Sequence, residues 1–534
     1  MPDFGPVFHH LGLILLALGV AMLGPVALDF ALADPNWAQV FEAAIETILF
    51  GALLALASAS GQRKGLTLQQ AYLLTAAIWI FVPLFGALPF IYGHPDVSFT
   101  DAYFEAVSGI TTTGYTVFSG LEDLPKSVVL WRGMLNWMGG LGIAFVAMIF
   151  LPVMRIGGMR YFQTEGFDTL GKVLPRAGDI AISLLQVYAG LTALCALVFA
   201  LCGMSILDAV IHAMAAIATG GFGTYDANFA IWSPAAQYAG TVFMLLGAMP
   251  YIRFFQLVHG QPVPLWRDLQ VRAFLRWYGY FCAVMILYRL SRESLPVEQI
   301  LRETTFNFAS LLTGTGFGVS AVEPWGAFAM VMAFLVGMVG GCTGSSSGAL
   351  SVFRVQATLA AIRAAVLQLH APHRIVPPRY GGTALDETTL GPLMLHVSGY
   401  ILTLGVLSVA LSMTGVDFTS SLFAIWGCLG NIGFGVGPLV ARTGTMIDFN
   451  FKFVLMRGLS ESVDTLTLAP RAGIRIELEN TKKAMATPGV ILYRVVNWED
   501  LASSKAFQTL LEDWIFEYQN GTAKPRSKKK RAAL

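Results

Sequence analysis

Four short segments of this sequence each place a glycine directly before an aromatic residue. They read Ser-Gly-Ile-Thr-Thr-Thr-Gly-Tyr-Thr at 108–116, Ala-Thr-Gly-Gly-Phe-Gly at 218–223, Thr-Gly-Thr-Gly-Phe-Gly at 313–318 and Gly-Asn-Ile-Gly-Phe-Gly at 430–435. The glycines recur at roughly even intervals along the chain, at Gly114, Gly221, Gly316 and Gly433. Such recurrence indicates an internal repeat of one structural unit.

The chemistry of these segments is that of a backbone filter for a monovalent cation. Rings of main-chain carbonyls replace the hydration shell of potassium in channels whose loops end in Gly-Tyr-Gly. Glycine permits the backbone angles that aim successive carbonyls at one axis. No Asp or Glu occurs in the four segments, which argues against a carboxylate ring for divalent ions. The residues expected to bind potassium are Thr112, Thr113, Gly114, Thr219, Gly220, Gly221, Gly314, Thr315, Gly316, Asn431, Ile432 and Gly433.

Each filter segment follows a short, mixed apolar stretch that must position it. These stretches lie near 101–112, 208–219, 303–314 and 419–430, and they are too short to cross a bilayer. We expect four re-entrant half-helices whose negative C-terminal ends point at the cation. Thirteen residues before each filter glycine stand residues expected to cap the half-helix, namely Asp101, Asp208, Glu303 and Ser420.

The composition requires a membrane environment. Of the 534 residues 55% are hydrophobic and 13% charged, against about 25% charged in soluble domains. Apolar stretches long enough to span lie near 11–32, 38–58, 69–92, 128–153, 180–202, 234–256, 272–290, 325–342 and 392–414. The five cysteines are scattered, so we expect neither a disulfide framework nor a covalent cofactor.

The sequence therefore predicts an all-α polytopic membrane protein with four pseudo-fourfold helix–re-entrant pore loop–helix repeats after an N-terminal two-helix hairpin. The expected divisions are a hairpin at 1–62, repeats at 63–165, 166–262, 263–370 and 371–456, and a divergent soluble tail at 457–534. Basic residues such as Arg155, Arg253 and Arg354 follow the second helices of the first three repeats. The positive-inside rule makes those loops cytoplasmic, so that the half-helices enter from outside.

A run of glycine, serine and threonine interrupts the helix that should follow the third filter. Its residues are Gly340, Gly341, Thr343, Gly344, Ser345, Ser346, Ser347 and Gly348, with Cys342 among them. Free backbone groups at membrane depth are expected only beside a cavity. The run predicts a flexible gate beneath the filter; the alternative is a flexible cytoplasmic connector.

With these motifs the sequence resembles the Trk/Ktr/HKT superfamily, specifically the bacterial Trk potassium-uptake membrane subunit, over about residues 10–445. The most specific segments are 111–116, 137–142, 265–268 with 270–272, and 340–348. The resemblance implies potassium uptake through one pore, a homodimer in the bacterial inner membrane, and gating by loop 340–348 and a cytosolic nucleotide-binding ring subunit. A glycine at Gly114, where sodium-permeable plant relatives have serine, implies potassium selectivity.

Two segments depart from that family. Gly348 is followed by Ala349, so a basic residue expected near this point is missing. After 449–456 no apolar run of spanning length follows, so the final helix is expected to be atypical or missing. The basic run at 524–531 is expected to be a solvated end, and no nucleic acid is expected as a partner.

The sequence also leaves three alternatives open. A proton- or sodium-coupled potassium symporter would need titratable groups on the ion path; Glu105 and His212 lie in half-helices, where we expect them to face protein. A membrane enzyme would need clustered polar groups at membrane depth, and no zinc-protease or paired-carboxylate motif occurs, so no enzyme is predicted. A family member that has lost its last helix would not conduct.

Overall fold

The computed structural model of the chain describes residues 4–59, 66–145, 177–371, 373, 376–435, 476–478 and 493–495. It divides into two units, Met1–Phe449 and Asn450–Leu534. In the second unit the described residues form one antiparallel pair, β3 (Ile476–Leu478) and β4 (Tyr493–Val495). The predicted last-helix segment at 449–456, the rest of the tail and Arg155 lie outside the described residues.

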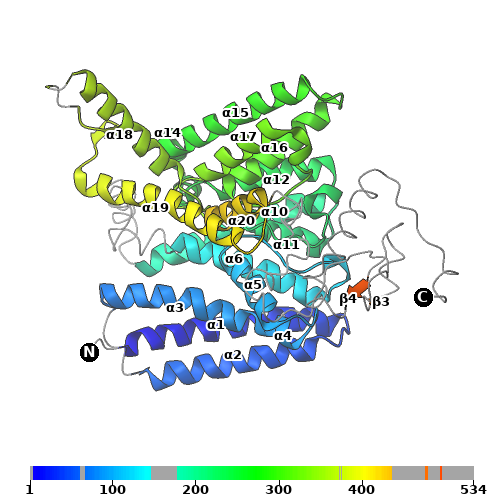
Figure 1. Ribbon diagram of the computed structural model, residues 1–534. Helices are drawn as coiled ribbons and strands as arrows, with labels where there is room; N and C mark the ends of the chain where they lie inside the picture. The colour runs from blue at the N-terminus through cyan, green and yellow to red at the C-terminus, as the bar shows by residue number, and fades with distance from the viewer. Residues whose placement is uncertain are drawn as a thin grey trace, which may run out of the picture. The chain divides into compact units, whose positions relative to one another are not determined.

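The chain begins with a hairpin of two long apolar helices, α1 (Gly5–Ala31) and α2 (Trp37–Ala57). Glycines bring the two backbones together, because a β-carbon on Gly12 would lie 2.5 Å from Ala55 N and one on Gly51 would lie 2.5 Å from Leu16 N. Small residues allow such close packing where the bilayer supplies no hydrophobic drive between helices. Figure 1 shows the hairpin, in dark blue, beside α3 at the bottom of the view.

The remaining helices of the first unit follow a recurring order of long helix, short helix, loop and helix. The first such series is α3 (Leu68–Gly86), α4 (Leu88–Tyr92), α5 (Phe99–Ile110), η2 (Leu121–Asp123) and α6 (Lys126–Phe145). The second is α10 (Ala177–Leu201), α11 (Ile206–Ile217), η5 (Asn228–Ile231), α12 (Pro234–Gly247), α13 (Tyr251–Val258) and α14 (Val263–Arg267). The third is α15 (Leu269–Leu290), α16 (Val297–Thr313), η6 (Glu323–Trp325), α17 (Ala327–Val339) and α18 (Val352–His370). The last described part is β1 (Arg379–Tyr380), β2 (Thr383–Ala384), α19 (Glu387–Ser412) and α20 (Phe418–Gly430).

The short helices α5, α11, α16 and α20 are the predicted half-helices, and the structure corrects how they begin. Ser98, Ser205 and Asp417 cap α5, α11 and α20, each accepting the N–H of the residue three positions later. The residues predicted as caps, Asp101, Asp208 and Ser420, are instead the residues whose N–H groups are capped. The prediction was therefore wrong by about one turn of helix. In the third repeat it fails altogether, because α16 begins at Val297 and Glu303 lies in its second turn.

Two of the longer helices are broken rather than continuous. Between α12 and α13 the axis bends by 98°, and α17 ends after 13 residues at Gly340. The chain resumes as α18, which is long and apolar enough to span a membrane, so Arg354 lies in a helix and not in the loop predicted from the basic residues. Among the described residues six helices meet the criteria for a span, or seven if the bent pair counts as one.

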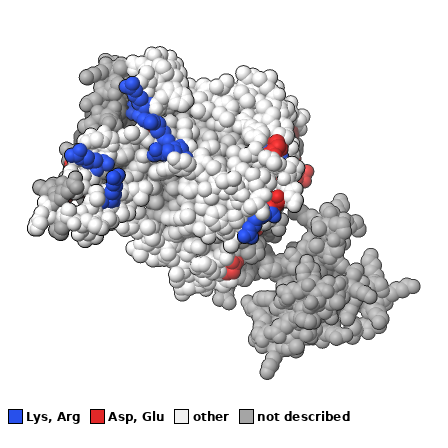
Figure 2. All heavy atoms as spheres, turned by 90° about the horizontal axis from the view of Figure 1, so that it is seen from above, with Lys and Arg blue, Asp and Glu red and all other residues white. Residues whose placement is uncertain are grey.

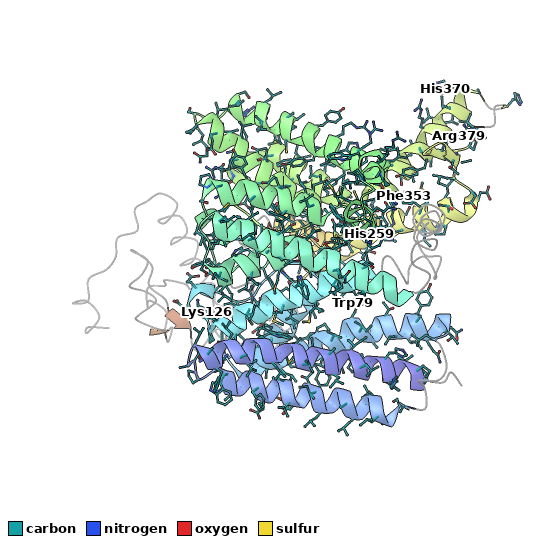
Figure 3. All side chains as sticks on the ribbon, turned by 180° about the vertical axis from the view of Figure 1, so that it is seen from behind. Trp79, Lys126, His259, Phe353, His370 and Arg379 are labelled. Carbon is teal, nitrogen blue, oxygen red and sulfur yellow. The ribbon has the colours of Figure 1, made fainter. Side chains whose placement is uncertain are left out.

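Charge is distributed toward the two ends of the bundle. Lys126, at the start of α6, lies at one end, and His370 and Arg379 lie at the other (Figure 3). On the face drawn in Figure 2, most Lys and Arg side chains lie toward the left edge and most Asp and Glu toward the right. The surface between them carries little charge, which suits contact with lipid tails.

Candidate functional site

The four glycine-aromatic loops share one backbone conformation. In each loop the glycine has a positive φ, at 90° for Gly114, 72° for Gly221, 85° for Gly316 and 63° for Gly433. The residue two positions earlier is also left-handed: Thr112 (58°), Thr219 (51°), Gly314 (73°) and Asn431 (56°). Residues with a β-carbon rarely adopt this conformation. The four loops therefore share, at both positions, a backbone conformation that is uncommon for residues with a side chain.

The loops approach one another in a closed cycle. A β-carbon on Gly114 of the first loop would lie 2.5 Å from the carbonyl oxygen of Gly220 in the second. The second loop approaches the third, the third the fourth and the fourth the first, since β-carbons on Gly221, Gly316 and Gly433 would collide with the carbonyl oxygens of Thr315, Ile432 and Thr113. All twelve residues predicted for the filter are thus brought together, with these four carbonyls packed against four glycines.

The aromatic residues of the loops lie behind this ring. The buried Tyr115 hydroxyl donates to the carbonyl of Phe434, 3.0 Å away in the fourth loop. The Phe222 ring lies 4.2 Å from the guanidinium carbon of Arg132, and the Phe317 ring packs on Phe229 with centroids 4.9 Å apart. Tyr115, Phe222 and Phe317 therefore link their loops to neighbouring parts of the bundle and limit how far the ring can widen.

Nine residues before the filter glycine, three of the half-helices carry a polar side chain behind the loop. Glu105 accepts from Val117 N at 3.0 Å, and Asn307 accepts from Val319 N at 3.2 Å. His212, the third, contacts Trp232 Nε1 at 3.4 Å. Glu105 and His212 are fully buried among protein groups, which confirms the expectation that they face protein.

The 340–348 segment lies against the ends of the half-helices. Ser346 Oγ lies 3.0 Å from Ile217 O, at the end of α11, and 3.2 Å from Thr219 Oγ1. Ser347 Oγ donates to Thr313 O, at the end of α16, at 2.6 Å. A β-carbon on Gly348 would lie 2.8 Å from Gly430 O, at the end of α20. The segment therefore touches three half-helix ends and the second filter loop.

The rest of the segment is held by hydrogen bonds within itself and by hydrogen bonds to the bend between α12 and α13. Cys342 N donates to Ala248 O at 2.9 Å, and Tyr251 N donates to Gly344 O at 3.1 Å, so it pairs with the α12–α13 bend. Gly341 N donates to Ser347 Oγ and Ser345 Oγ to Cys342 O. Gly340 and Gly344 have positive φ values of 75° and 85°. The segment is therefore bonded both within itself and to the α12–α13 bend.

Sequence reasoning missed how the Leu265–Arg272 motif serves this segment. Asp268 caps α15 and accepts from Arg253 Nε of α13 at 2.7 Å. Two residues later, Gln270 Oε1 accepts from Thr343 N at 2.9 Å. The motif thus connects α13, α15 and the 340–348 segment. From the sequence, this motif could be recognised only as one of the segments that carry the family resemblance. Its hydrogen-bond partners could not be predicted, because they lie far away along the chain.

The site offers oxygen ligands without a carboxylate cluster. In the part of the chain that the structure describes, no three His, Cys, Asp or Glu side chains gather as a metal site. The oxygens at the ring are main-chain carbonyls, threonine hydroxyls and the side-chain amide oxygen of Asn431. Such neutral dipoles suit a weakly hydrated monovalent cation that must both bind and leave.

Comparison with known proteins finds one matching family and several similar proteins. The sequence profile of one family, described as TrkH, cation transport protein, matches residues 37–461. The Trk system potassium uptake protein TrkI of Halomonas elongata is 34% identical over 443 residues, covering 83% of this chain and 90% of that protein. The TrkH protein of Vibrio parahaemolyticus is 31% identical over 85% of this chain and 95% of its own length.

A solved structure agrees with these sequence matches. The crystal structure of the potassium transporter TrkH from Vibrio parahaemolyticus superimposes with a TM-score of 0.77 at 30% identity. The match covers 85% of this chain and 95% of that one. Fold and sequence therefore indicate the same relatives.

Proposed function

Since this chain belongs to the TrkH family of cation transport proteins, we propose that it carries potassium into the cell through the ring formed by its four filter loops. It is a mostly helical, multi-pass bacterial membrane protein, and it is no enzyme, because the family is one of transporters. The observation that carries the proposal is the cycle of glycine-to-carbonyl approaches around the four loops.

The ring has the chemistry that potassium transport needs. Four loops with paired left-handed residues bring main-chain carbonyls together, and the half-helices direct the negative ends of their dipoles toward them. A membrane potential near −100 mV contributes about 2.3 kcal/mol per charge, enough for roughly 50-fold accumulation without a coupled ion. The second candidate, a proton- or sodium-coupled symporter, is less favoured because the side chains of Glu105 and His212 are fully buried and hydrogen-bonded to protein groups.

We further propose that the 340–348 segment is the gate. It lies against three half-helix ends, and hydrogen bonds from Ser346 and Ser347 hold it there. Displacing it would uncover the inner side of the ring. We also propose assembly as a homodimer with a cytosolic nucleotide-binding ring subunit; the family resemblance supports it, as does the naming of the relatives as Trk system proteins.

The test is rubidium uptake by the chain in a bacterial strain that lacks its own potassium importers. We expect uptake above the empty-vector control, with unlabelled potassium competing better than sodium. Proteoliposomes clamped at a fixed potential then separate the two mechanisms, since a pH or sodium gradient alone drives only a symporter. No uptake by protein that is present in the membrane would overturn the proposal and favour a non-conducting family member.

A further inference from the structure

Asn431 distinguishes the fourth filter loop from the other three. The position two residues before the filter glycine is Thr112, Thr219 and Gly314 in the first three loops. All four residues have a positive φ, and asparagine is among the few residues other than glycine that tolerate it. The backbone therefore accounts for a glycine or asparagine here, and the side chain needs a separate explanation.

That side chain joins the fourth loop to the first. Thr113 Oγ1 donates to Asn431 Oδ1 at 2.5 Å, while Asn431 Nδ2 lies 3.2 Å from Thr112 O and 3.0 Å from Thr112 Oγ1. The amide oxygen accepts and the amide nitrogen donates, so both ends are satisfied. The partners are 318 and 319 residues away in sequence.

This junction differs from those between the other loops. In the second and third loops the threonine hydroxyls bond differently: Thr313 with Thr315 of its own loop, and Thr219 with Ser346 of the 340–348 segment. The first and fourth loops are also the two ends of the repeat series, so no short linker joins them. Asn431 supplies a side-chain bridge at the seam where the ring closes.

Asn431 also lies close to the third loop and to the 340–348 segment. A β-carbon on Gly314 of the third loop would lie 3.0 Å from Asn431 O. A β-carbon on Gly348 of the 340–348 segment would lie 2.7 Å from Asn431 Cβ. The residue is therefore packed between the first loop, the third loop and the proposed gate, where a small displacement changes the ring's width.

We propose that Asn431 is a specificity-determining residue, whose side-chain amide fixes the separation of the first and fourth loops and holds the Thr112 carbonyl at the inner end of the filter. The inference rests on the proposed potassium transport through this ring. With the amide in place, the Thr112 carbonyl cannot swing inward around a smaller ion, and one of its lone pairs is already occupied. Loosening the seam should therefore favour sodium relative to potassium.

The third repeat provides the matched variant. Asn431→Gly reproduces Gly314, which has the same left-handed backbone, and so removes the amide while keeping the helix ending. Asn431→Asp keeps the shape and the acceptor for Thr113 but loses the N–H groups that hold Thr112. Both variants are compared with the parent by rubidium uptake and its competition by potassium and sodium, with membrane amounts and thermal-unfolding midpoints of the purified proteins as folding controls.

We expect the preference for potassium over sodium to fall about tenfold in both variants. A tenfold change corresponds to the free energy of roughly one net hydrogen bond, here the bond that holds the Thr112 carbonyl. A purely structural role would lower the uptake rate or the unfolding midpoint without changing that ratio. If both variants keep the parent's ratio while the parent transports rubidium, the inference is wrong and the proposed function stands. If the parent itself transports nothing, the proposed function fails and the inference fails with it.

Discussion

The guanidinium of Arg132 lies 2.7 Å from the carboxylate of Glu105, and both side chains are almost completely buried, at 1% and 0% exposure. The pair joins two filter loops. Glu105 also accepts from Thr116 Oγ1 at 2.8 Å in the first loop, and Arg132 Nη1 donates to Gly223 O at 3.0 Å in the second. Arg132 thereby connects α6 to both loops, behind the ring of carbonyls.

Removing Arg132 should damage the fold and transport together. In Arg132→Met the buried Glu105 loses its charged partner, a change that costs about 3–5 kcal/mol in comparable buried pairs. We expect a large fall in the thermal-unfolding midpoint of the purified protein and loss of rubidium uptake.

The control for Arg132→Met is an ion pair of the same chain whose carboxylate partner is exposed. Glu298 pairs with Arg302 at 2.9 Å, but its side chain is 57% exposed, so Glu298→Gln should cost no more than about 1 kcal/mol. An Arg132→Met protein as stable as the Glu298→Gln protein would show that the buried pair does not brace the loops.

Gly221→Ala should strongly reduce uptake without unfolding the protein. A β-carbon there would collide with Thr315 O, and alanine at a φ of 72° adds about 1–2 kcal/mol of backbone strain. The matched control is Gly279→Ala in α15, where a β-carbon meets no atom within 4 Å. We expect rubidium uptake to fall more than about tenfold in the first variant and to stay at the parent level in the second. Equal uptake by both would mean that the ring does not carry the ion.

Ser346→Ala should raise the flux through the protein. The hydroxyl contacts Ile217 O at 3.0 Å and Gly247 O at 3.3 Å, so its loss weakens the docking of the 340–348 segment. One net hydrogen bond is worth about 0.5–1.5 kcal/mol, which predicts roughly a 2- to 13-fold rise in the open-to-closed ratio. The measurement is rubidium efflux from loaded proteoliposomes. Ser291→Ala, which removes an exposed hydroxyl bonded to Tyr288 O, is the control, and a drop in efflux in Ser346→Ala would contradict a gating role.

Asp417 should give α20 a pH-dependent cap. Desolvation raises the pKa of this carboxyl, but hydrogen bonds from Ser420 and neighbouring backbone N–H groups outweigh it and leave the pKa below its ordinary value. A lowered folded-state pKa means that the stabilisation is present above the unfolded pKa and is lost as the pH falls through the folded one.

The measurement for Asp417 is the unfolding midpoint of three proteins across acidic pH. Asp417→Ala should cost about 1 kcal/mol at neutral pH, and its difference from the parent should shrink as the pH falls. Asn caps helices as well as Asp does, so Asp417→Asn should differ from Asp417→Ala by a pH-independent amount. A parent-to-alanine difference that does not change with pH would contradict the cap.

The features predicted from sequence are those encoded locally. Glycine-aromatic pairs marked the four loops, and short apolar stretches marked the half-helices to within a few residues, except α16, which begins six residues before the stretch expected at 303–314. The bend between α12 and α13 could not be predicted from the length of the apolar stretch. The stretch continues through the break at Met249 and Pro250, so it looks like one continuous helix in the sequence. Helix starts were misplaced because an acidic residue in the first turn was taken for the cap that Ser98 supplies.

Contacts between distant segments had no signal in the sequence. The bridge from Asn431 to Thr112 and the bond from Gln270 to Thr343 join residues 319 and 73 positions apart. Both use common polar side chains with no distinctive spacing. Their partners become visible only once the loops are folded around one axis.

The most direct test of the central claim compares the parent with Gly114→Ser in rubidium uptake, with sodium as competitor and sodium uptake measured in parallel. A side chain at Gly114 would press on Gly220 O, where the first loop meets the second. We predict that the parent takes up rubidium with sodium a poor competitor, and that the variant loses this preference and admits sodium. A variant with the parent's ion preference, at equal amounts in the membrane, would contradict a filter built from these four loops.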